Sequence, residues 1–418
     1  MNSTRAVAEP VFQQHTRSGS KIRWWIAGLL FCSTVINYMD RQNLSILART
    51  IQNDLSITDI QYGYVVQAFL LAYTIMNLVA GRLTDWLGAR RSMAVFVSWW
   101  SIADILTSLS RSALSLGCFR FLLGIGEPGN YTAAPKAVSE WFPLKERGFV
   151  IGLYTAGATL GATIAPPLVA LVAGGFGWRV AFLCTGSLGL LWLMPWLTIY
   201  RTPKASETIE EEQPAAGPWR EIVSRRETWA LLVCRSLTDP VWYFLLFWFP
   251  KYLNDSRHLS LTATGRIAWI VYLGADLGCI TAGYVSSVLI RRGLQPVASC
   301  VRVMAISAIL MLLSPLVTYS PTALLATLVA AVGAFGHLSW QTSLSTLIVD
   351  LYPKRLMGTV FGLVAAGSGL GSMFFLNIAG QVVSKYSYKP VFIAMAFLHP
   401  MAWLLINKSL RITNSTAF

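Results

Sequence analysis

Ionisable residues interrupt several long apolar stretches of this sequence, and their chemistry most needs an explanation. The stretch that begins near Trp24 reaches Asp40 and Arg41 in VINYMDRQNL. Another stretch contains Arg120 and Glu127, which are seven residues apart and therefore about two turns along one helix face. Such groups inside an apolar span usually face a cavity, pair with one another or serve an ion path. The pattern therefore predicts ion or proton chemistry.

More charges follow in the second part of the chain. Arg235 and Asp239 in CRSLTDPVW are four residues apart and share a helix face, and Asp276 lies in YLGADLGC. We expect these three residues to form a charge network. His337 lies in a further apolar stretch, in FGHLSW. Asp104 has neither a cation nor a motif near it in the sequence, so we expect a structural role for it.

The carboxylates and the arginines suggest different tasks. Burial favours a neutral carboxyl group and a nearby arginine favours the charged form, so a carboxylate under both influences can load and release a proton. Glu127, beside Pro128 where a helix can break, is the first candidate for this role, and Asp40 is the second. Arg41 is the candidate anchor for a substrate carboxylate, because its fork stays charged and binds both oxygens. Static salt bridges are the alternative for all of them.

Aromatic and polar side chains complete the candidate substrate site. Tyr38, Tyr73 and Trp340 offer a stacking surface and hydroxyl or N–H donors, although tyrosine and tryptophan also gather at membrane interfaces. The further candidates for substrate contact are Arg120, Asn130, His337 and Gln341.

Composition says what must position these residues. Of 418 residues, 55% are apolar and 12% are charged, against about 25% charged in soluble domains. Segments of about 20 apolar residues can cross the hydrocarbon core as helices. Twelve are predicted: Ile22–Leu47, Ile60–Gly81, Ser92–Leu109, Leu114–Pro135, Gly148–Val172, Trp178–Ile199, Trp229–Leu253, Thr264–Ile290, Val297–Tyr319, Pro321–Val349, Gly358–Val383 and Pro390–Ile406.

The net charge of +14 has a topological explanation. Most lysines and arginines fall in the tails and alternate loops on one side, which places both termini in the cytoplasm and argues against nucleic acid. No apolar core precedes Trp24, so no cleaved signal peptide is expected. The six cysteines form no CxxC pair, and no metal-ligand cluster or nucleophile–base arrangement is present. We therefore expect no cofactor, no metal and no enzyme activity.

The chain contains an internal repeat. A shift of 210 residues aligns EWFPLKERGFVIGLYTAGATLG, from Glu140, with DLYPKRLMGTVFGLVAAGSGLG, from Asp350, with nine of 22 positions identical. Matched glycines suit close helix packing in lipid. The repeat predicts two parallel six-helix bundles that rock around a midplane site. The predicted domains are a tail (1–21), a first bundle (22–200), a linker (201–228), a second bundle (229–407) and a tail (408–418).

A charged loop separates the second and third spans, GRLTDWLGARR, with Gly81, Asp85, Arg90 and Arg91. A carboxylate between a helix end and a basic cluster can form a latch that takes part in gating. This loop resembles the signature loop of the major facilitator superfamily, with Trp86 at a position that is usually basic. The corresponding loop of the second half, GYVSSVLIRRG, lacks the aspartate, so the first half should carry more of the latch.

Taken together, the motifs resemble the anion:cation symporters of this superfamily, most of all bacterial hexuronate transporters. The resemblance covers nearly the full length and includes RFLLGIGEPGNYTAAPKAVSEWFPLKERG, RSLTDPVWYFLLFWFPKYL and GHLSWQTSLSTLIVDLYP. Ala158 replaces a glutamine of aldonate carriers, which disfavours an aldonate. The resemblance implies that Asp40 and Glu127 carry protons, Arg41 binds the substrate carboxylate, Arg120 partners the fourth-span carboxylate, and Tyr38, Tyr73 and Trp340 line the pocket.

The expected function is proton-driven import of an aldohexuronate by alternating access. The alternatives are the same fold carrying another organic anion, namely an aldonate, an aromatic acid or a tartrate-like diacid, or, more remotely, a membrane sensor. The expected partners are a small organic anion, protons and the lipid bilayer. We expect a monomer that spans the plasma membrane several times, in bacteria the inner membrane.

Overall fold

The computed structural model describes residues 21–202, 219–259 and 261–415, which form helices and turns without a strand. The predicted all-α class is confirmed. The helices are α1 (Ile22–Ile46), α2 (Ala48–Leu55), α3 (Asp59–Thr107), α4 (Ala113–Gly126), α5 (Pro128–Trp141), α6 (Leu144–Phe176), α7 (Trp178–Ile199), α8 (Trp219–Val223), α9 (Arg226–Phe247), α10 (Phe249–Arg257), α11 (Leu261–Arg291), α12 (Pro296–Met311), α13 (Leu316–Tyr319), α14 (Ala323–Leu351), α15 (Lys354–Lys385) and α16 (Lys389–Ser415).

These helices account for twelve membrane spans. The long α3 makes two of them, α4 and α5 together make the fourth, and α10 and α13 extend the spans begun by α9 and α12. The short α2 and α8 lie outside this count. Of the predicted domains, the N-terminal tail and most of the linker fall outside the described residues, and the domain limits stay predictions.

Not every span is a single long and uniformly apolar helix. Within the described residues, eight helices are long and apolar enough to cross a membrane, or nine if the bent pair α9 and α10 is one span. The long α3 is one helix in this count although it makes two spans. The helices α4 and α5 are each too short to be counted, with 14 residues. The first span carries Asp40 and Arg41. The spans left out are thus the first and the fourth, which also carries Arg120 and Glu127, and one of the two spans in α3.

The predicted loop from Gly81 to Arg91 is shorter than expected. The backbone is helical on both sides of Gly88, which alone has φ 77° and ψ 164°. Positive φ costs glycine little, because it has no Cβ. One residue therefore reverses the chain between the second and third spans.

Glycines bring the two halves of the molecule into backbone contact. Gly81 of α3 lies against Gly358 of α15, and Gly148 of α6 lies against Gly283 of α11. A Cβ at Gly81, Gly283 or Gly358 would meet the backbone of the facing helix, so any larger residue there would force the helices apart. Both crossings lie at the end of the bundle that carries the turn at Gly88.

The same glycine pattern repeats within each half. Gly157 and Gly161 of α6 lie against α1, whereas Gly367 and Gly371 of α15 lie against α9. Since the sequence repeat aligns these glycines pairwise, α6 and α15 use matched positions to contact matched neighbours. The internal repeat is therefore visible as a structural pseudo-symmetry.

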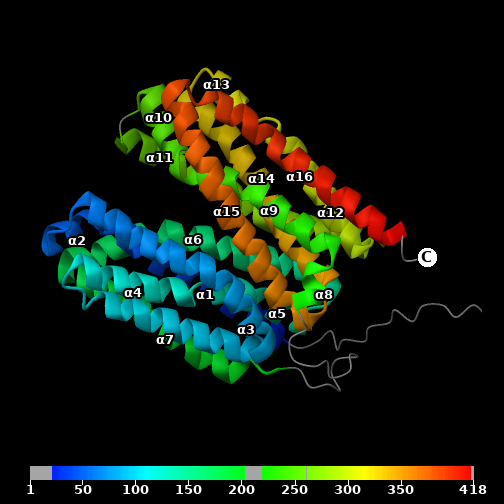
Figure 1. Ribbon diagram of the computed structural model, residues 1–418, viewed down its shortest axis with the longest axis horizontal. Coiled ribbons are helices and arrows are strands. Elements are labelled where there is room, and N and C mark those ends of the chain that lie inside the picture. Colours follow the sequence, from blue (N-terminus) through cyan, green and yellow to red (C-terminus); the bar gives the residue numbers. More distant parts are fainter. Residues whose placement is uncertain (1–20, 203–218, 260, 416–418) are drawn as a thin grey trace, which may run out of the picture.

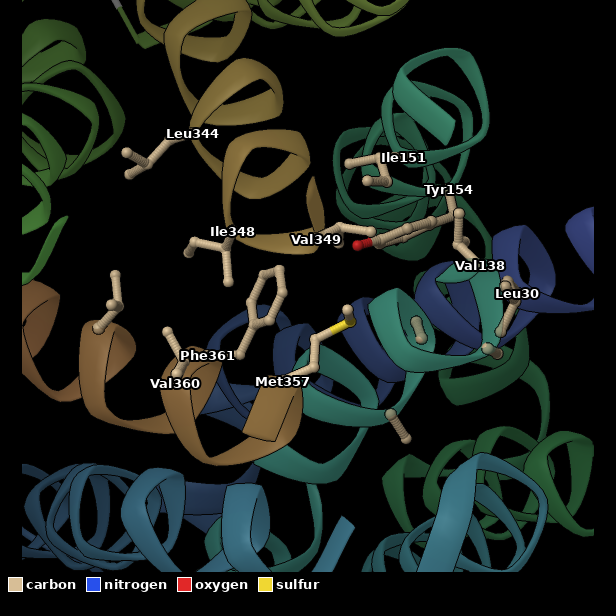
Figure 2. Close-up of a cluster of buried hydrophobic side chains, with 14 of the residues drawn as sticks. Leu30, Val138, Ile151, Tyr154, Leu344, Ile348, Val349, Met357, Val360 and Phe361 are labelled. Atoms are coloured by element: carbon tan, nitrogen blue, oxygen red, sulfur yellow. The ribbon is translucent and has the colours of Figure 1, made fainter. Parts of the chain in front are cut away.

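An apolar core joins the halves near these crossings. In Figure 1 the first half and the second half diverge toward the end with α2 and α10. Figure 2 shows side chains of α14 and α15, such as Ile348 and Phe361, facing those of α5 and α6, such as Val138 and Tyr154. These residues belong to one buried cluster. The halves are therefore held together at one end by apolar packing as well as by the glycines.

Opening this end should depend on the glycine contacts. A Cβ on Gly152 would collide with the backbone carbonyl of Cys279 on α11. We expect Gly152→Val to cost the closed contact about 1–3 kcal/mol, a shift toward opening of roughly five- to a hundredfold. Cys279 is fully buried, so the measurement is the rate of its labelling by a thiol reagent when the other cysteines are replaced by serine.

The matched control is Gly28→Val, because a Cβ on Gly28 meets nothing within 4 Å. This variant should leave the labelling rate unchanged. Equal labelling rates in the Gly152→Val protein and its parent would show that the glycine contact does not hold this end closed.

Candidate functional site

The centre of the first half holds an ion pair between α1 and the α4–α5 junction. Arg41 donates from Nε and Nη2 to Oε2 of Glu127, at 2.8 and 2.5 Å. The side chain of Glu127 is 0% exposed and that of Arg41 is 26% exposed. The other carboxylate oxygen of Glu127, Oε1, has no hydrogen-bond partner among the described residues. The pair therefore has one fully buried member and one member that solvent or a ligand can reach.

The local sequence explains the position of Glu127. Pro128 follows it and has no N–H to donate, so α4 ends at Gly126 and α5 begins at Pro128. Glu127 keeps helical angles, φ −59° and ψ −36°, so the span changes little in direction. Gly129 has no side chain and so admits the ring of Phe96 from α3.

Aromatic rings surround the guanidinium of Arg41. The rings of Tyr38, Tyr73 and Phe69 lie 4.9, 4.7 and 5.6 Å from its Cζ atom. Cations attract the faces of aromatic rings, and the attraction grows when water is excluded. Tyr38 and Tyr73 are thus beside Arg41, whereas Phe69 was missed, because nothing in its sequence context distinguishes it from a lipid-facing residue.

A second polar cluster lies on the other side of α1. Asp40 is fully buried, and neither of its carboxylate oxygens has a hydrogen-bond partner in the described part of the chain. It lies close to Asp104 and Thr185. Asp104 accepts from Thr185 Oγ1 at 2.8 Å and from Arg120 Nη2 at 3.4 Å. Two carboxyl groups therefore share this part of the interior.

Arg120 differs from what the family resemblance implies. It forms its ion pair with Asp104, and its Nη1 donates to the backbone carbonyl of Asp40 at 3.3 Å. Glu127 belongs to Arg41 instead, because two helical turns separate Arg120 from Glu127 by about 10 Å along the axis. Asp104 was expected to have a structural role, but its cation was missed because it comes from another helix.

Asn130, a candidate for substrate contact, has both ends of its amide engaged with α1. Its Oδ1 accepts from Ser33 at 2.9 Å, and its Nδ2 donates to Thr34 at 3.1 Å. Asn130 therefore joins α5 to α1 in this conformation.

The second half contains a separate aromatic cluster. His337 Nδ1 lies 3.2 Å from Nε2 of His399, and the ring of Trp242 stacks on His337. Trp340 is 0% exposed, and its ring meets the edge of His399. The structure thus groups His337 and Trp340 with each other. His399 was missed because its AMAFLHPMAW context offers no charged neighbour.

Arg235 and Asp239 of α9 form the ion pair that their spacing suggests, with Nε and Oδ2 2.5 Å apart. Arg235 Nη1 also donates to the hydroxyl of Tyr131 on α5 at 2.6 Å, and Gln341 Nε2 lies 3.5 Å from the same hydroxyl. Tyr131 therefore links the halves. The sequence analysis did not predict this role for it. No ion pair of the described residues joins Asp276 to this group; it lies beside Thr159 of α6.

The loop from Gly81 to Arg91 places one carboxylate between the halves. Asp85 accepts from the backbone N–H of Gly358 at 2.8 Å and from the N–H and hydroxyl of Thr359 at 2.7 and 2.6 Å. Lys136 of α5 lies 3.2 Å from the same carboxylate. Arg90 instead donates to the carbonyl of Leu197 in α7.

The basic pair therefore does not join this latch. Arg90 binds within the first half, Arg91 is exposed, and Lys136 supplies the positive charge beside Asp85. In the second half, Ser287 occupies the position of Asp85 and donates to its own helix, so its crossing relies on glycine contact.

Comparisons with known proteins define the class. The sequence model of the Major Facilitator Superfamily matches residues 30–376, so the chain belongs to this superfamily. It is 15% identical to the human organic anion transporter MFSD10, with a TM-score of 0.72 over 93% of this chain and all of that one. It is 14% identical to the proton:xylose symporter XylE, also with a TM-score of 0.72, over 92% of this chain and 95% of that one. The predicted fold is confirmed.

Relatives of higher identity are named as carriers of sugar acids. The hexuronate transporter of Escherichia coli (strain K12) is 29% identical over 405 residues, which cover 92% of this chain and 93% of the relative. The galacturonate transporter of Dickeya chrysanthemi is 34% identical over 280 residues, which cover 63% of this chain and 81% of the relative. The D-galactonate transporter of Escherichia coli O6:H1 is 25% identical over 410 residues, which cover 90% of this chain and 94% of the relative. The chain is thus a multi-pass membrane transporter and not an enzyme.

The Arg120–Asp104 pair should be a major stabilising contact. Removing one partner of a buried ion pair costs about 3–5 kcal/mol, and here Arg120 loses the carboxylate to which it is hydrogen-bonded. We expect Asp104→Ala to lower the thermal stability of the detergent-solubilised protein strongly, and Asp104→Asn to lower it less, because the amide keeps hydrogen bonding to Thr185.

The control for this prediction is Asp54→Ala. Asp54 pairs with Arg179 at 2.8 Å and also accepts from Trp178 Nε1 at 3.1 Å. The side chains of Asp54 and Arg179 are 45% and 43% exposed, and exposed ion pairs contribute about 0–1 kcal/mol. Equal losses for Asp54→Ala and Asp104→Ala would contradict the structural importance of the buried pair.

Proposed function

We propose that this transporter is a proton-coupled symporter that imports a sugar acid, most specifically an aldohexuronate, and acts as a monomer in the bacterial inner membrane. The support is the chemistry around Arg41 together with the names of the relatives. A guanidinium flanked by two tyrosines matches a carboxylate joined to a hydroxylated ring. Asp40 and Glu127 carry the protons, and Arg41 binds the carboxylate.

The observation that carries this proposal is that Glu127 already occupies Arg41. Both donors, Nε and Nη2, point to one oxygen of Glu127. A substrate carboxylate on Arg41 brings a second negative charge to the same guanidinium, so it competes with ionised Glu127 for that positive charge. Protonation of Glu127 removes its charge and releases the guanidinium. Binding of the anion is therefore linked to the uptake of a proton.

Charge balance extends this argument to Asp40. Asp40, Asp104 and Glu127 lie within electrostatic reach of Arg120, and Arg41 is the second cation, so three negative groups face two positive ones. An uncompensated charge in this interior is costly, so the cluster with Glu127 ionised holds one proton, shared by Asp40 and Asp104. With substrate bound to Arg41 and Glu127 neutral, the cluster holds two protons.

The direction of transport follows from the topology. The positive-inside rule assigns the end with Arg90 and Arg91 to the cytoplasm, together with both termini. The glycine crossings and the Asp85 latch lie at that end, so this conformation is closed toward the cytoplasm. Substrate then enters from outside, and the halves rock to release it. Release of only the Glu127 proton with one monoanion moves no net charge. Release of the shared Asp40–Asp104 proton as well moves one positive charge, to which the membrane potential contributes about 2.3 kcal/mol per 100 mV.

Glu127→Gln separates binding from proton coupling. Glutamine keeps the shape but cannot be ionised, so Arg41 stays free for the substrate. We expect exchange of labelled substrate in proteoliposomes to persist, whereas accumulation driven by a pH gradient is lost. Gradient-driven accumulation equal to that of the unmodified protein would remove Glu127 from the coupling mechanism.

Arg41→Lys tests the carboxylate anchor. Lysine keeps the charge but loses the fork, and a charged hydrogen bond contributes about 1.5–3 kcal/mol. We expect the KM for galacturonate or glucuronate to rise roughly ten- to a hundredfold. The assay is proton uptake with a panel of hexuronates, aldonates, aromatic acids, dicarboxylic acids and neutral sugars. A response to neutral sugars alone would show that Arg41 is not an anchor.

A further inference from the structure

The ion pair of Arg235 and Asp239 has no role in the mechanism proposed above, although it lies between the two halves. Its members are on adjacent turns of α9, and their side chains are 10% and 7% exposed. Arg235 reaches across to Tyr131 of the first half. Asp239 uses Oδ2 for Arg235, whereas its Oδ1 is buried and has no hydrogen-bond partner. A buried acceptor without a partner needs an explanation, because it costs stability.

This pair lies one helical turn from the Arg41 site. Glu127, which holds Arg41, and Tyr131, which holds Arg235, are four residues apart, and the backbone stays helical through Glu127. Four residues correspond to a rise of about 6 Å along the helix between the residues that hold the two arginines. Arg41 and Arg235 thus come from opposite halves of the transporter to neighbouring levels of one span.

The two arginines flank the same tyrosines. Tyr38 of α1 lies within electrostatic reach of both Arg41 and Arg235. Tyr243 of α9 lies within reach of both Asp239 and Arg41. The Arg41 site and the Arg235–Asp239 pair therefore share the tyrosines that lie between them.

Two arginines from opposite halves would, by themselves, favour a molecule with a carboxylate at each end. Asp239 prevents this in two ways. It neutralises Arg235, and its own charge repels a second carboxylate. A sugar hydroxyl instead finds Oδ1 as a free acceptor, which satisfies the unpartnered oxygen. Repulsion of the wrong ligand is a common source of specificity.

We propose that Asp239 is a specificity residue that makes the second end of the site bind a neutral, hydroxylated group and reject a carboxylate. The transporter thereby accepts sugar acids with one carboxylate and excludes six-carbon dicarboxylic acids. This inference rests on the proposed function, because it takes Arg41 as the anchor of the first carboxylate.

The test is Asp239→Asn, with galacturonate and galactarate as probes. The amide removes the repelling charge and leaves Arg235 available for the second carboxylate. We expect the ratio of galactarate to galacturonate affinity to rise roughly tenfold or more. Affinities come from thermal-shift titration of the purified protein and from competition with labelled galacturonate uptake. No gain of galactarate binding, with galacturonate still bound, would overturn the proposal.

Three controls isolate the charge of Asp239. Asp239→Glu keeps the repulsion and should continue to exclude galactarate. Asp276→Asn neutralises another carboxylate of the second half that has no ion pair among the described residues, and it should not admit galactarate either. The double variant with Arg235→Gln and Asp239→Asn should lose the gain, because the second anchor is gone. A gain in any of these variants contradicts the assignment.

The unmodified protein provides a test that does not depend on folding of a variant. Galactarate should fail to inhibit galacturonate uptake at concentrations where glucuronate inhibits it, and equal inhibition by galactarate and glucuronate would overturn the proposal. Absence of uptake of every hexuronate would instead overturn the proposed function. Thermal shifts with galactarate, measured on the unmodified protein and on the Asp239→Asn variant, would still decide whether Asp239 excludes galactarate.

Discussion

The arrangement of this transporter depends on the high energy of an unpaired charge in a medium that excludes water. Every charged group in the middle of the first half is either paired or close to a group that compensates it. Arg41 pairs with Glu127 and Arg120 with Asp104. Asp40 has no hydrogen bond to its carboxylate and lies among the others. In the proposed mechanism, coupling follows from this constraint, since a substrate anion can take Arg41 only when a proton takes Glu127.

A second constraint acts on the helices that carry these charges. Rocking of two halves requires surfaces that meet closely in one state and separate in another, and matched glycines supply them on α6 and α15. Each of these helices crosses one helix of its own half and one helix of the other. The crossings thus connect the closed end of the molecule to α1, which carries Asp40 and Arg41, and to α9, which carries Arg235 and Asp239.

The sequence predicted the fold well, because the signals for it are local or periodic. Apolar length, the charge asymmetry of the loops and the repeat together predicted twelve helices in two related halves. Spacing within one helix was also informative, as in the four-residue interval between Arg235 and Asp239. Contacts between helices were different. Asp104 looked isolated because Arg120 comes to it from another span, and Arg120 and Glu127 share a face yet bind different neighbours. Local patterns contain no information on which helices become neighbours.

The two halves differ in how their arginines are neutralised, and this difference suggests a division of labour. The partner of Arg41 lies on another helix, at a proline break, so the pair can separate when either helix moves or when Glu127 changes charge. The partner of Arg235 lies one turn away on the same helix, so that pair moves as a unit. A pair that can separate suits energy coupling, because its state can change during a cycle. A pair on one helix keeps its two charges together when the halves move, which suits the selection of a ligand.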